Sequence, residues 1–497
     1  MAASDTTALV WLRRDLRLHD HPPLVRALAE HARVVPVFVL DPALLRGRFA
    51  SGPRTAFLLA CLRSLDDDLR ARGSGLVVRV GRPERELVAL AREAGASAVL
   101  WASDATPYAL ARDRRVRAAL AEAEVEAVPG PGNFVADVGK PRTRGGTPFS
   151  VFTPFHRSWQ QLERRPVHRA PAELPPLPSR VAKGSVPPLE ELVGARVAAD
   201  AGALAAGSGS RGGSASATDA PLGEPAVEPG EAAAREVAER WLDDHLPDYA
   251  RDHDRLAGGA SQLSAYLRFG LLSPRELEQR AERRGGEGGA AFARQLAWRD
   301  FYAHVLLHNP ANLRREHQER MRRLRWEDDP DGLAAWQEGR TGFPLVDAAM
   351  RQLRGSGWMH NRARLVVGSF LTKDLQLDWR AGEAWFMRWL LDGDVASNNG
   401  NWQWIASVGV DPAPAFRRIL NPALQQQRHD PDGAYVRRWV PELAGVPDEL
   451  LSEPWRMTDE QQQAAGCRIG SDYPAPLVDH REERQRALAR YRETAGG

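Results

Sequence analysis

Residues 8–40 read ALVWLRRDLRLHDHPPLVRALAEHARVVPVFVL, and two apolar runs in this stretch, 8–12 and 34–40, flank a segment of helical amphipathicity. Two further apolar runs, LVVRV (76–80) and AVLWA (98–102), continue the alternation. Near-continuously apolar strands are typical of a parallel sheet that helices cover on both faces. The sequence therefore predicts a doubly wound α/β domain over residues 1–130. No GxGxxG motif follows the first run, so the usual dinucleotide site is not supported.

The composition excludes several classes of protein. The 497-residue chain has 67 Lys and Arg against 65 Asp and Glu, so its net charge of +2 creates no global field for a charged partner. Its two cysteines, Cys61 and Cys467, lie far apart, which excludes a disulfide framework and a cysteine-built zinc site. We predict a protein of the reducing cytoplasm without a metal site. No membrane segment is expected, since no run of about 18 apolar residues occurs.

Two changes of pattern divide the rest of the chain. Residues 131–230 are predicted to connect two domains, and their last part, 194–230, is rich in Gly, Ala, Ser and Pro. That composition is typical of a flexible linker or a partly disordered insertion. From 231 to 497 the pattern is helical, which predicts an all-α C-terminal domain. Eleven of the 15 tryptophans lie at or beyond Trp298, so their function is expected in this domain.

Two segments of the predicted helical domain carry groups that suit ligand binding. GGASQLSAYLRFGLLSP (258–274) places Ser261 and Ser264 where a helix begins after two glycines, so hydroxyls and free N–H groups could bind a phosphate. Simple N-capping explains the same serines. QLAWRDFY (295–302) puts an amide, an indole and a guanidinium on one helix face, and an ordinary half-buried face is the alternative.

A third segment, GWMHNRARLVVGSFLTKDLQLDW (357–379), combines His360 with Asn361, Arg362 and Arg364 ahead of an apolar helical stretch. His360 has no second ligand four residues on, which favours a buried histidine over a metal ligand.

The sharpest signal is DGDVASNNGNWQWIASVGVD (392–411). Its Asp, Asn and Gly residues are turn formers. Trp402 and Trp404, however, lie two residues apart in a predicted helix and so point about 200° apart at about 100° per residue. One indole can therefore face an inner cofactor while the other faces an outer cavity.

Basic clusters supply the local charge that the net charge conceals. Residues 311–326 have six Arg against two Glu, and residues 416–439 have five Arg against two Asp. Arginines among Gln, Asn and Trp suit the binding of a phosphate backbone with base stacking. A solvated basic face is the alternative.

Together these segments resemble the DNA photolyase/cryptochrome family over nearly the whole chain. The matching motifs are WLRRDLRLHDHPPL (11–24), VFTPFHRSW (151–159), WRDFY (298–302), GRTGFPLVDAAMRQL (339–353), GWMHNR (357–362), DGDVASNNGNWQW (392–404), NPALQQQ (421–427) and YVRRWVPEL (435–443). Within the family, the chain is most similar to the bacterial enzymes that repair cyclobutane pyrimidine dimers, because MHNR and SNNGNWQW keep their asparagines.

The resemblance implies light-dependent DNA repair in three parts: an N-terminal antenna domain, a connector and a helical FAD-binding domain. Reduced FAD absorbs blue light, donates an electron to a dimer flipped out of UV-damaged DNA, and recovers it after the ring splits. The cofactor carries the chemistry and the protein supplies position and electrostatics. A dimer must leave the base stack to reach it. We expect a monomer that does not bind membranes.

The resemblance also assigns residues, position by position. FAD contacts are expected from Tyr249, Ser261, Leu263, Ser264, Arg299, Arg364, Asp392 and Asp394, with Asn398 beside the reactive flavin nitrogen. The dimer is expected against Trp298 and Trp404, with Gln295 and Asn361 beside it. Photoreduction of FAD is expected through Trp402, Trp379 and Trp326. DNA contacts are expected from Arg362, Arg417, Arg418 and Gln425. An antenna chromophore of the 8-hydroxy-deazaflavin type, or alternatively methenyltetrahydrofolate, is expected at Arg13, Asp41, Asp104 and Tyr108.

Some positions depart from the family pattern. Gln295 replaces the usual glutamate of dimer-repairing enzymes, and an amide can hydrogen-bond a pyrimidine edge but cannot carry charge. Leu365 replaces a frequent methionine. Ala260 and Phe292 replace a common threonine and tryptophan of the FAD pocket, which bears on affinity for the cofactor. Gln295 also occurs in (6-4) photolyases, whose repair histidines are missing here, and a cryptochrome-like light sensor is a further alternative.

Overall fold

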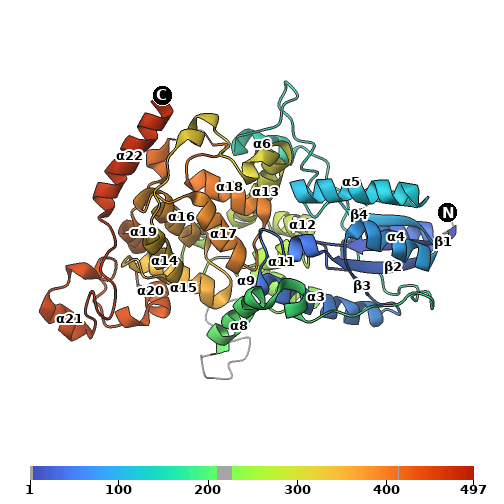
Figure 1. Cartoon of the computed structure of the whole chain (residues 1–497), viewed down its shortest axis with the longest axis horizontal. Coiled ribbons are helices and arrows are strands. Elements are labelled where there is room, and N and C mark those ends of the chain that lie inside the picture. Colours follow the sequence, from blue (N-terminus) through green and yellow to red (C-terminus); the bar gives the residue numbers. More distant parts are fainter. Residues whose placement is uncertain (1–3, 210–226, 412–413, 497) are drawn as a thin grey trace.

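The computed structural model describes residues 4–209, 227–411 and 414–496. It consists of an α/β region followed by a larger helical region, which lie beside each other along the long axis of the molecule (Figure 1). None of the described helices is both long enough and apolar enough to cross a membrane.

Five parallel strands form one sheet in the order β3-β2-β1-β4-β5. Their bounds are β1 (Ser4–Leu12), β2 (His31–Leu40), β3 (Val77–Val80), β4 (Ala96–Ala102) and β5 (Glu126–Gly130). The central strand places Leu9 opposite Val35 on one side and Val99 on the other. The four predicted strands and the doubly wound order are confirmed. The fifth strand was missed because EAVPG is short and ends in Pro-Gly, which is typical of a turn.

Helices cover both faces of this sheet. They are α1 (Pro22–Glu30), α2 (Pro42–Leu45), α3 (Gly52–Arg70), α4 (Pro83–Ala94) and α5 (Pro107–Glu122). Each has a proline in its first turn, where the missing N–H has no intrahelical partner to lose. Side chains of Asp41, Ser51 and Thr106 cap three of them. These helices therefore begin where a capping residue is followed by proline in the first turn.

The connector contains α6 (Phe152–Gln160), α7 (Leu189–Val193) and α8 (Ala195–Gly209). The prediction of a flexible linker is wrong for residues 195–209, which form a helix packed between α3 and α15. Alanine is the best helix former, and the small side chains permit close packing. An ion pair between Asp200 and Arg388, at 2.7 Å, holds α8 to the helical region. Residues 210–226 of the predicted linker lie outside the described residues.

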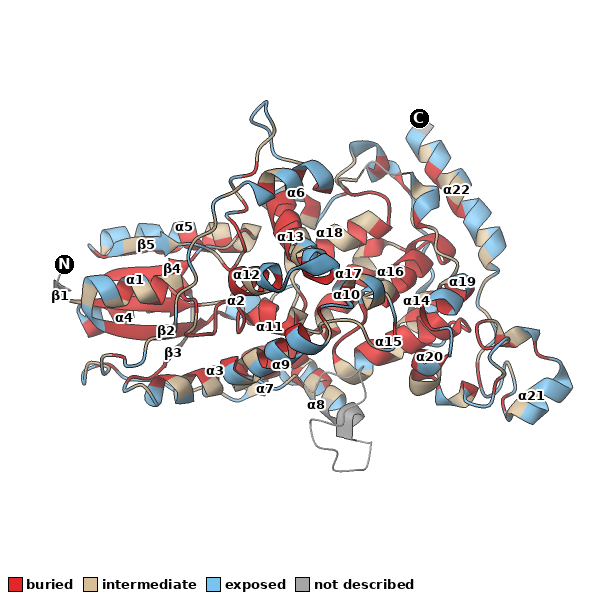
Figure 2. Ribbon diagram, turned by 180° about the vertical axis from the view of Figure 1, so that it is seen from behind, coloured by how far each residue is buried: buried red, intermediate tan, exposed pale blue. Residues whose placement is uncertain are grey.

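The remainder is helical, as predicted (Figure 2). It comprises α9 (Glu231–Asp244), α10 (Tyr249–Asp252), α11 (Ser264–Phe269), α12 (Pro274–Arg284), α13 (Gly286–His308), η1 (Pro310–Leu313), η2 (Glu319–Arg323), α14 (Pro330–Glu338), α15 (Pro344–Ser356), α16 (Asn361–Ser369), the π-helical turn η3 (Phe370–Asp374), α17 (Trp379–Trp389), α18 (Val395–Ile405), η4 (Ala415–Arg418), α19 (Pro422–His429), α20 (Ala434–Trp439), η5 (Pro441–Leu443), η6 (Pro454–Arg456), α21 (Asp459–Ala465) and α22 (His480–Gly496).

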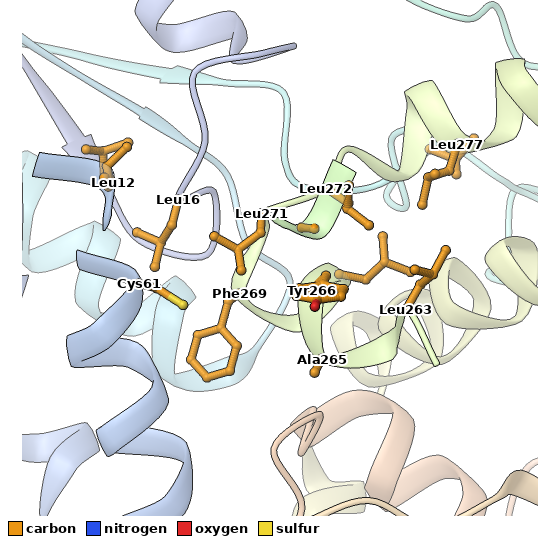
Figure 3. Close-up of a cluster of buried hydrophobic side chains, with 14 of the residues drawn as sticks. Leu12, Leu16, Cys61, Leu263, Ala265, Tyr266, Phe269, Leu271, Leu272 and Leu277 are labelled. Atoms are coloured by element: carbon orange, nitrogen blue, oxygen red, sulfur yellow. The ribbon is translucent and has the colours of Figure 1, made fainter. Parts of the chain in front are cut away.

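The two regions share a hydrophobic core at the carboxyl end of the sheet. Leu16, which follows β1, and Cys61 of α3 lie near Phe269 and Leu271 in one buried cluster (Figure 3). Polar contacts add to it, since the Glu231 carboxylate accepts the backbone N–H of Leu18 at 2.6 Å and of His19 at 3.0 Å. The carboxyl ends of the strands are therefore fixed against the helical region.

This shared core predicts unequal costs for two leucine truncations. Leu16 is 1% exposed in the junction and Leu44 is 49% exposed on α2. Leu16→Ala should lower the free energy of unfolding by about 2–5 kcal/mol, because it leaves a cavity, whereas Leu44→Ala should change it by less than about 0.5 kcal/mol. Urea unfolding followed by circular dichroism measures both values. Equal effects of the two substitutions would show that the junction is not a packed core.

Candidate active site

A cavity of about 530 Å³ lies within the helical region, between α10, α11, α13, α16 and α18. It gathers side chains from distant parts of the chain. Of the residues predicted for the site, Tyr249, Ser261, Ser264, Gln295, Trp298, Arg299, Asn361, Arg364, Asp392, Asp394 and Trp404 line it.

A smaller chamber of about 80 Å³ continues the cavity inward. The two share Asn361, Arg364 and Asp392 among their lining residues, and Asn398 and Trp402 line only the inner one. Trp404 lines only the outer one. The predicted division of the two tryptophans between an inner and an outer face of α18 is therefore confirmed.

The start of α18 explains the motif DGDVASNNGNWQW. Asp394 caps the helix by accepting the Ser397 N–H at 2.8 Å. The amide of Asn398 donates to the Glu383 carbonyl of α17 at 3.0 Å. Gly400 allows close approach, because a Cβ there would lie 2.1 Å from the ring of Tyr302. The motif thus places α18 between α13 and α17 while its tryptophans face the cavity.

A buried charge cluster lies at the cavity wall. Asp394 forms an ion pair with Arg14, which follows β1 in the α/β region. Burial alone would raise the pKa of this carboxyl, but the positive charges of Arg14, Arg268 and Arg299 hold the pKa well below its usual range. Asp394 is therefore ionised and joins the sheet to the cavity.

Sequence reasoning missed several lining residues, of which Arg268 is the most informative. Its Nε donates to the Gly393 carbonyl at 2.8 Å, and the side chain lines the outer cavity. The signal was its position four residues after Ser264, which places both on one face of α11. Tyr302, Ser397, Asn401 and Asp411 also line the cavity without having been predicted.

Arg364 and Asp392 form the second charged pair of the wall. Their ion pair measures 2.7 Å, and Arg364 Nε also donates to the Met359 carbonyl at 2.8 Å. These contacts fix the guanidinium at the junction of the two chambers.

The loop before α11 presents the predicted serines. Ser261 and Ser264 both line the outer cavity, and Gln262 between them adopts a positive φ of 55°. Leu263 differs from the prediction of a cofactor contact, because its side chain is fully buried in the core between the regions (Figure 3). The apolar side chain anchors the loop and the hydroxyls remain at the cavity.

Two aromatic walls flank the outer cavity. The ring of Trp298 stacks on Phe152 of the connector, with centroids 3.7 Å apart and planes 5° apart. Trp404 donates its indole N–H to Asp411 at 3.0 Å. Gln295 and Asn361 are exposed beside these walls. A flat apolar ligand that enters this cavity would therefore find two indoles and two amides among the lining side chains.

The residues predicted to contact DNA occupy different environments. Arg417 is exposed, whereas Arg418 is 1% exposed, pairs with Asp411 at 2.6 Å and lies 4.3 Å from the ring centre of Trp404. We therefore reassign Arg418 from the DNA surface to the support of the cavity wall. Arg362 is half-buried and pairs with Asp254. Gln425 is half-buried on α19.

Two of the three predicted electron-transfer tryptophans are buried and the third is half-buried. Trp402 is 3% exposed and Trp379 is fully buried, whereas Trp326 is half-buried beneath Arg490. The described rings in contact with Trp402 are Phe386, at 5.0 Å between centroids, and Trp336, at 6.2 Å.

The predicted antenna residues lie at the carboxyl ends of β1, β2 and β4. Arg13 pairs with Asp113 at 2.7 Å, and the Tyr108 hydroxyl donates to Asp41. Arg13 and Asp104 line a cavity of only about 20 Å³, which is close to the size of a single water site. The structure thus brings these four residues to one edge of the sheet, but only Tyr108 and Asp41 bond each other, whereas Arg13 pairs with Asp113 and Asp104 with Arg14.

Comparison of this chain with known proteins identifies the family to which it belongs. Residues 8–178 match the family model described as DNA photolyase, and residues 292–493 match the model described as FAD binding domain of DNA photolyase. A curated protein of Streptomyces griseus named deoxyribodipyrimidine photo-lyase is 41% identical, with 97% of this chain and 98% of that protein covered. The chain belongs to the DNA photolyase family.

Solved structures of photolyases and cryptochromes share the fold. A class III photolyase from Agrobacterium tumefaciens has a TM-score of 0.88 and 32% identity, covering 100% of this chain and 99% of the other. A cryptochrome from Synechocystis sp. PCC6803 has a TM-score of 0.83 and 30% identity, covering 99% of both chains.

The residues of this photolyase fit FAD. Arg268, Arg299 and the two loop serines present cations and hydroxyls that suit a pyrophosphate. In the inner chamber, the buried Trp402 indole N–H has no hydrogen-bond partner among the described residues, so it is available to a polar ring. The two chambers are therefore the candidate position for the cofactor of the FAD binding domain.

The charge cluster predicts a specific effect of Asp394→Asn. Asparagine keeps an N-cap but removes the charge that Arg14, Arg268 and Arg299 require, so FAD affinity should fall by about tenfold to a hundredfold. Absorbance of bound flavin relative to protein measures the loss. Asp378→Asn is the matched control, because Asp378 caps α17 but does not line either chamber. Equal flavin retention in both variants would contradict a role for the Asp394 charge.

Proposed function

We propose that this photolyase splits cyclobutane pyrimidine dimers in UV-damaged DNA, driven by light. The observation that carries the proposal is that Trp298 and Trp404 both line one outer cavity, which shares Asn361, Arg364 and Asp392 with the inner chamber. When bound, reduced FAD supplies the electron that opens the cyclobutane ring and takes it back afterwards. The name of the Streptomyces relative supports this activity.

The outer cavity recognises the flipped lesion. Two indoles match the stacked, apolar faces of a pyrimidine dimer, and the amides of Gln295 and Asn361 can hydrogen-bond its edges. A dimer pairs weakly, so it leaves the duplex at less cost than an intact pair. The walls are fixed beforehand, Trp298 by Phe152 and Trp404 by Asp411 and Arg418. The site is therefore preorganised for its substrate.

DNA binds across the mouth of this cavity. Arg417 is exposed there and follows the segment after Trp404, and Arg362 and Gln425 remain proposed contacts. The basic cluster at 311–326 lies beside the same segment, because Gln318 donates to the carbonyls of Gly409 and Asp411 at 2.9 and 3.2 Å. Phosphate contacts from both sides of the mouth would hold the duplex while the lesion enters.

Three tryptophans deliver electrons to the inner chamber. Trp402 lines it, Trp379 is buried and Trp326 reaches the surface, which suits stepwise transfer from solvent. Asn398, held by the Glu383 carbonyl, is proposed to contact the reactive flavin nitrogen.

A second chromophore is proposed at the carboxyl edge of the sheet. Arg13 follows β1 and Asp104 follows β4, so the pair lies where the strand order reverses, the usual ligand position of such sheets. Asp41 and Tyr108 join them, and an 8-hydroxy-deazaflavin is proposed ahead of methenyltetrahydrofolate.

A reducing, cytoplasmic compartment is supported by two buried, free cysteines, and a monomer is proposed.

Two observations favour second candidates. The likeness to the Synechocystis cryptochrome favours a light sensor, which would keep the flavin and the tryptophans without repair. Gln295 favours (6-4) repair, but Asn361 and Leu365 line the cavity where that chemistry would need histidines.

The opposite faces of Trp402 and Trp404 predict opposite phenotypes. Trp402→Phe should slow photoreduction of FAD by at least about tenfold and leave repair within about twofold when FAD is supplied reduced. Trp404→Phe should weaken repair and leave photoreduction unchanged, since Trp404 lines only the outer cavity. Flavin absorbance under blue light and repair of a dimer-containing oligonucleotide measure the two activities. Loss of both activities in either variant would contradict the division.

Restoring the carboxyl at position 295 tests how the amide affects repair. Gln295→Glu should raise the repair yield, by up to about tenfold, because a charged or proton-donating carboxyl bonds the pyrimidine edge more strongly than an amide. The quantum yield of repair on reduced enzyme is the measurement. An unchanged or lower yield would show that this pocket has adapted to the amide.

A further inference from the structure

A second cavity, of about 610 Å³, lies on the far side of the Trp298 wall. It opens between α6 of the connector and the junction of α12 with α13, helices that lie side by side (Figure 1). It shares no lining residue with the FAD cavity. The proposed function assigns nothing to it. We call it the α6–α13 slot.

The slot has one aromatic wall. The ring of His156 lies 5.4 Å from Phe152 with planes 17° apart, and 5.8 Å from Trp159 with planes 23° apart. Trp159 is held in place, because its indole N–H donates to the buried Asp300 at 3.0 Å. Trp159 is 2% exposed and the Arg164 guanidinium lies 4.2 Å from its ring centre, so the half-buried His156 offers the ring on which a further flat group can stack.

Small residues make up much of the remaining lining. They lie around the start of α13: Gly285, Gly286, Gly289, Ala290, Ala291 and Ala293. Their short side chains leave room for a planar group and let that group approach the backbone. A bulky aliphatic ligand would gain less from this shape.

The charge of the slot favours an anionic ligand. Arg294 lines the slot, is exposed, and has no hydrogen-bond or ion-pair partner among the described residues; its guanidinium lies 5.0 Å from the ring centre of Phe152. Arg164 is neutralised by the buried Glu278 at 2.9 Å. Glu282 is the acid of the rim and is exposed to water, which screens it. Arg294 is therefore an unneutralised cation beside an aromatic surface.

His156 supplies a neutral edge. Burial lowers its pKa, and the neighbouring charges of Arg294 and Arg164 lower it further. No hydrogen bond of its ring occurs among the described residues, so one ring nitrogen can donate and the other can accept.

We propose that the α6–α13 slot binds a planar heteroaromatic anion, a conjugated ring that carries a carboxylate or phosphate. The ring stacks on His156, which Trp159 supports, and the anionic group pairs with Arg294. A pterin with a glutamate tail and a flavin mononucleotide share this chemistry. Because Phe152 stacks on both His156 and Trp298, the ligand lies two rings from the wall of the repair cavity. A light-absorbing ligand there would be a chromophore close to FAD and separate from the sheet edge.

The test uses the full-length, FAD-loaded protein and two probes, folic acid and FMN, with inorganic phosphate as the control anion. Quenching of probe or tryptophan fluorescence gives the affinity. At least one probe should bind saturably in the presence of excess phosphate. Arg294→Gln should weaken that binding by about tenfold or more, and Ala290→Phe, which fills the slot from an exposed helix position, should abolish it. Arg283→Gln removes an exposed arginine outside the slot and should have no effect.

The possible outcomes distinguish a pterin ligand from a flavin nucleotide, and failure of this proposal from failure of the proposed function. Binding of folic acid alone identifies a pterin site, and binding of FMN alone a nucleotide site. Binding that survives both slot variants would overturn the proposal and favour the sheet edge. The proposal would also be overturned if neither probe binds. It would be overturned equally if undamaged oligonucleotide is the only competitor that displaces a bound probe. Circular dichroism and flavin content establish that each variant is folded, and dimer repair does not enter the readout, so failure here leaves the proposed function intact.

Discussion

The ion pair between Arg14 and Asp394 is the interaction on which the rest of the site depends. Arg14 follows the first strand of the sheet, and Asp394 caps α18, the helix that carries Trp402 and Trp404. A buried carboxylate surrounded by three arginines is ionised in the folded state and cannot lose its partners without a large penalty. The α/β region therefore supplies the charge, on Arg14, that holds one wall of the candidate cofactor cavity.

Helix α18, which begins at Asp394, presents different side chains to the two chambers. Asn398 and Trp402 face the inner chamber, and Trp404 faces the outer cavity. The same helix thus positions the proposed electron donor of the flavin and one wall of the lesion pocket. The other wall depends on the connector, since Phe152 stacks on Trp298. A third element, Arg418, supports Trp404 from behind. The cavity is therefore built by contributions from all three predicted parts of the chain.

The sequence predicted what depends on local pattern. Apolar runs gave the strands, and the helical period of residues 392–411 separated Trp402 from Trp404. It failed where tertiary contacts decide the outcome. The alanine-rich residues 195–209 resemble a linker, but their small side chains let α8 pack on α3. Arg418 lies in a basic cluster, and only the fold shows that Asp411 and Trp404 bury it. Leu263 lies in the loop whose serines line the cavity, yet its own side chain faces the core. Phe152 lies far from the cavity residues in sequence, so no local pattern links it to Trp298.

We propose that one cavity holds both the flavin and a flipped cyclobutane dimer. The decisive experiment is blue illumination of the full-length, FAD-reduced protein with an oligonucleotide that contains one cyclobutane thymine dimer. We expect light-dependent conversion of the dimer to two thymines with no net consumption of reductant, and no conversion in the dark. Persistence of the dimer while the flavin still undergoes its light-driven cycle would refute repair and favour a light sensor.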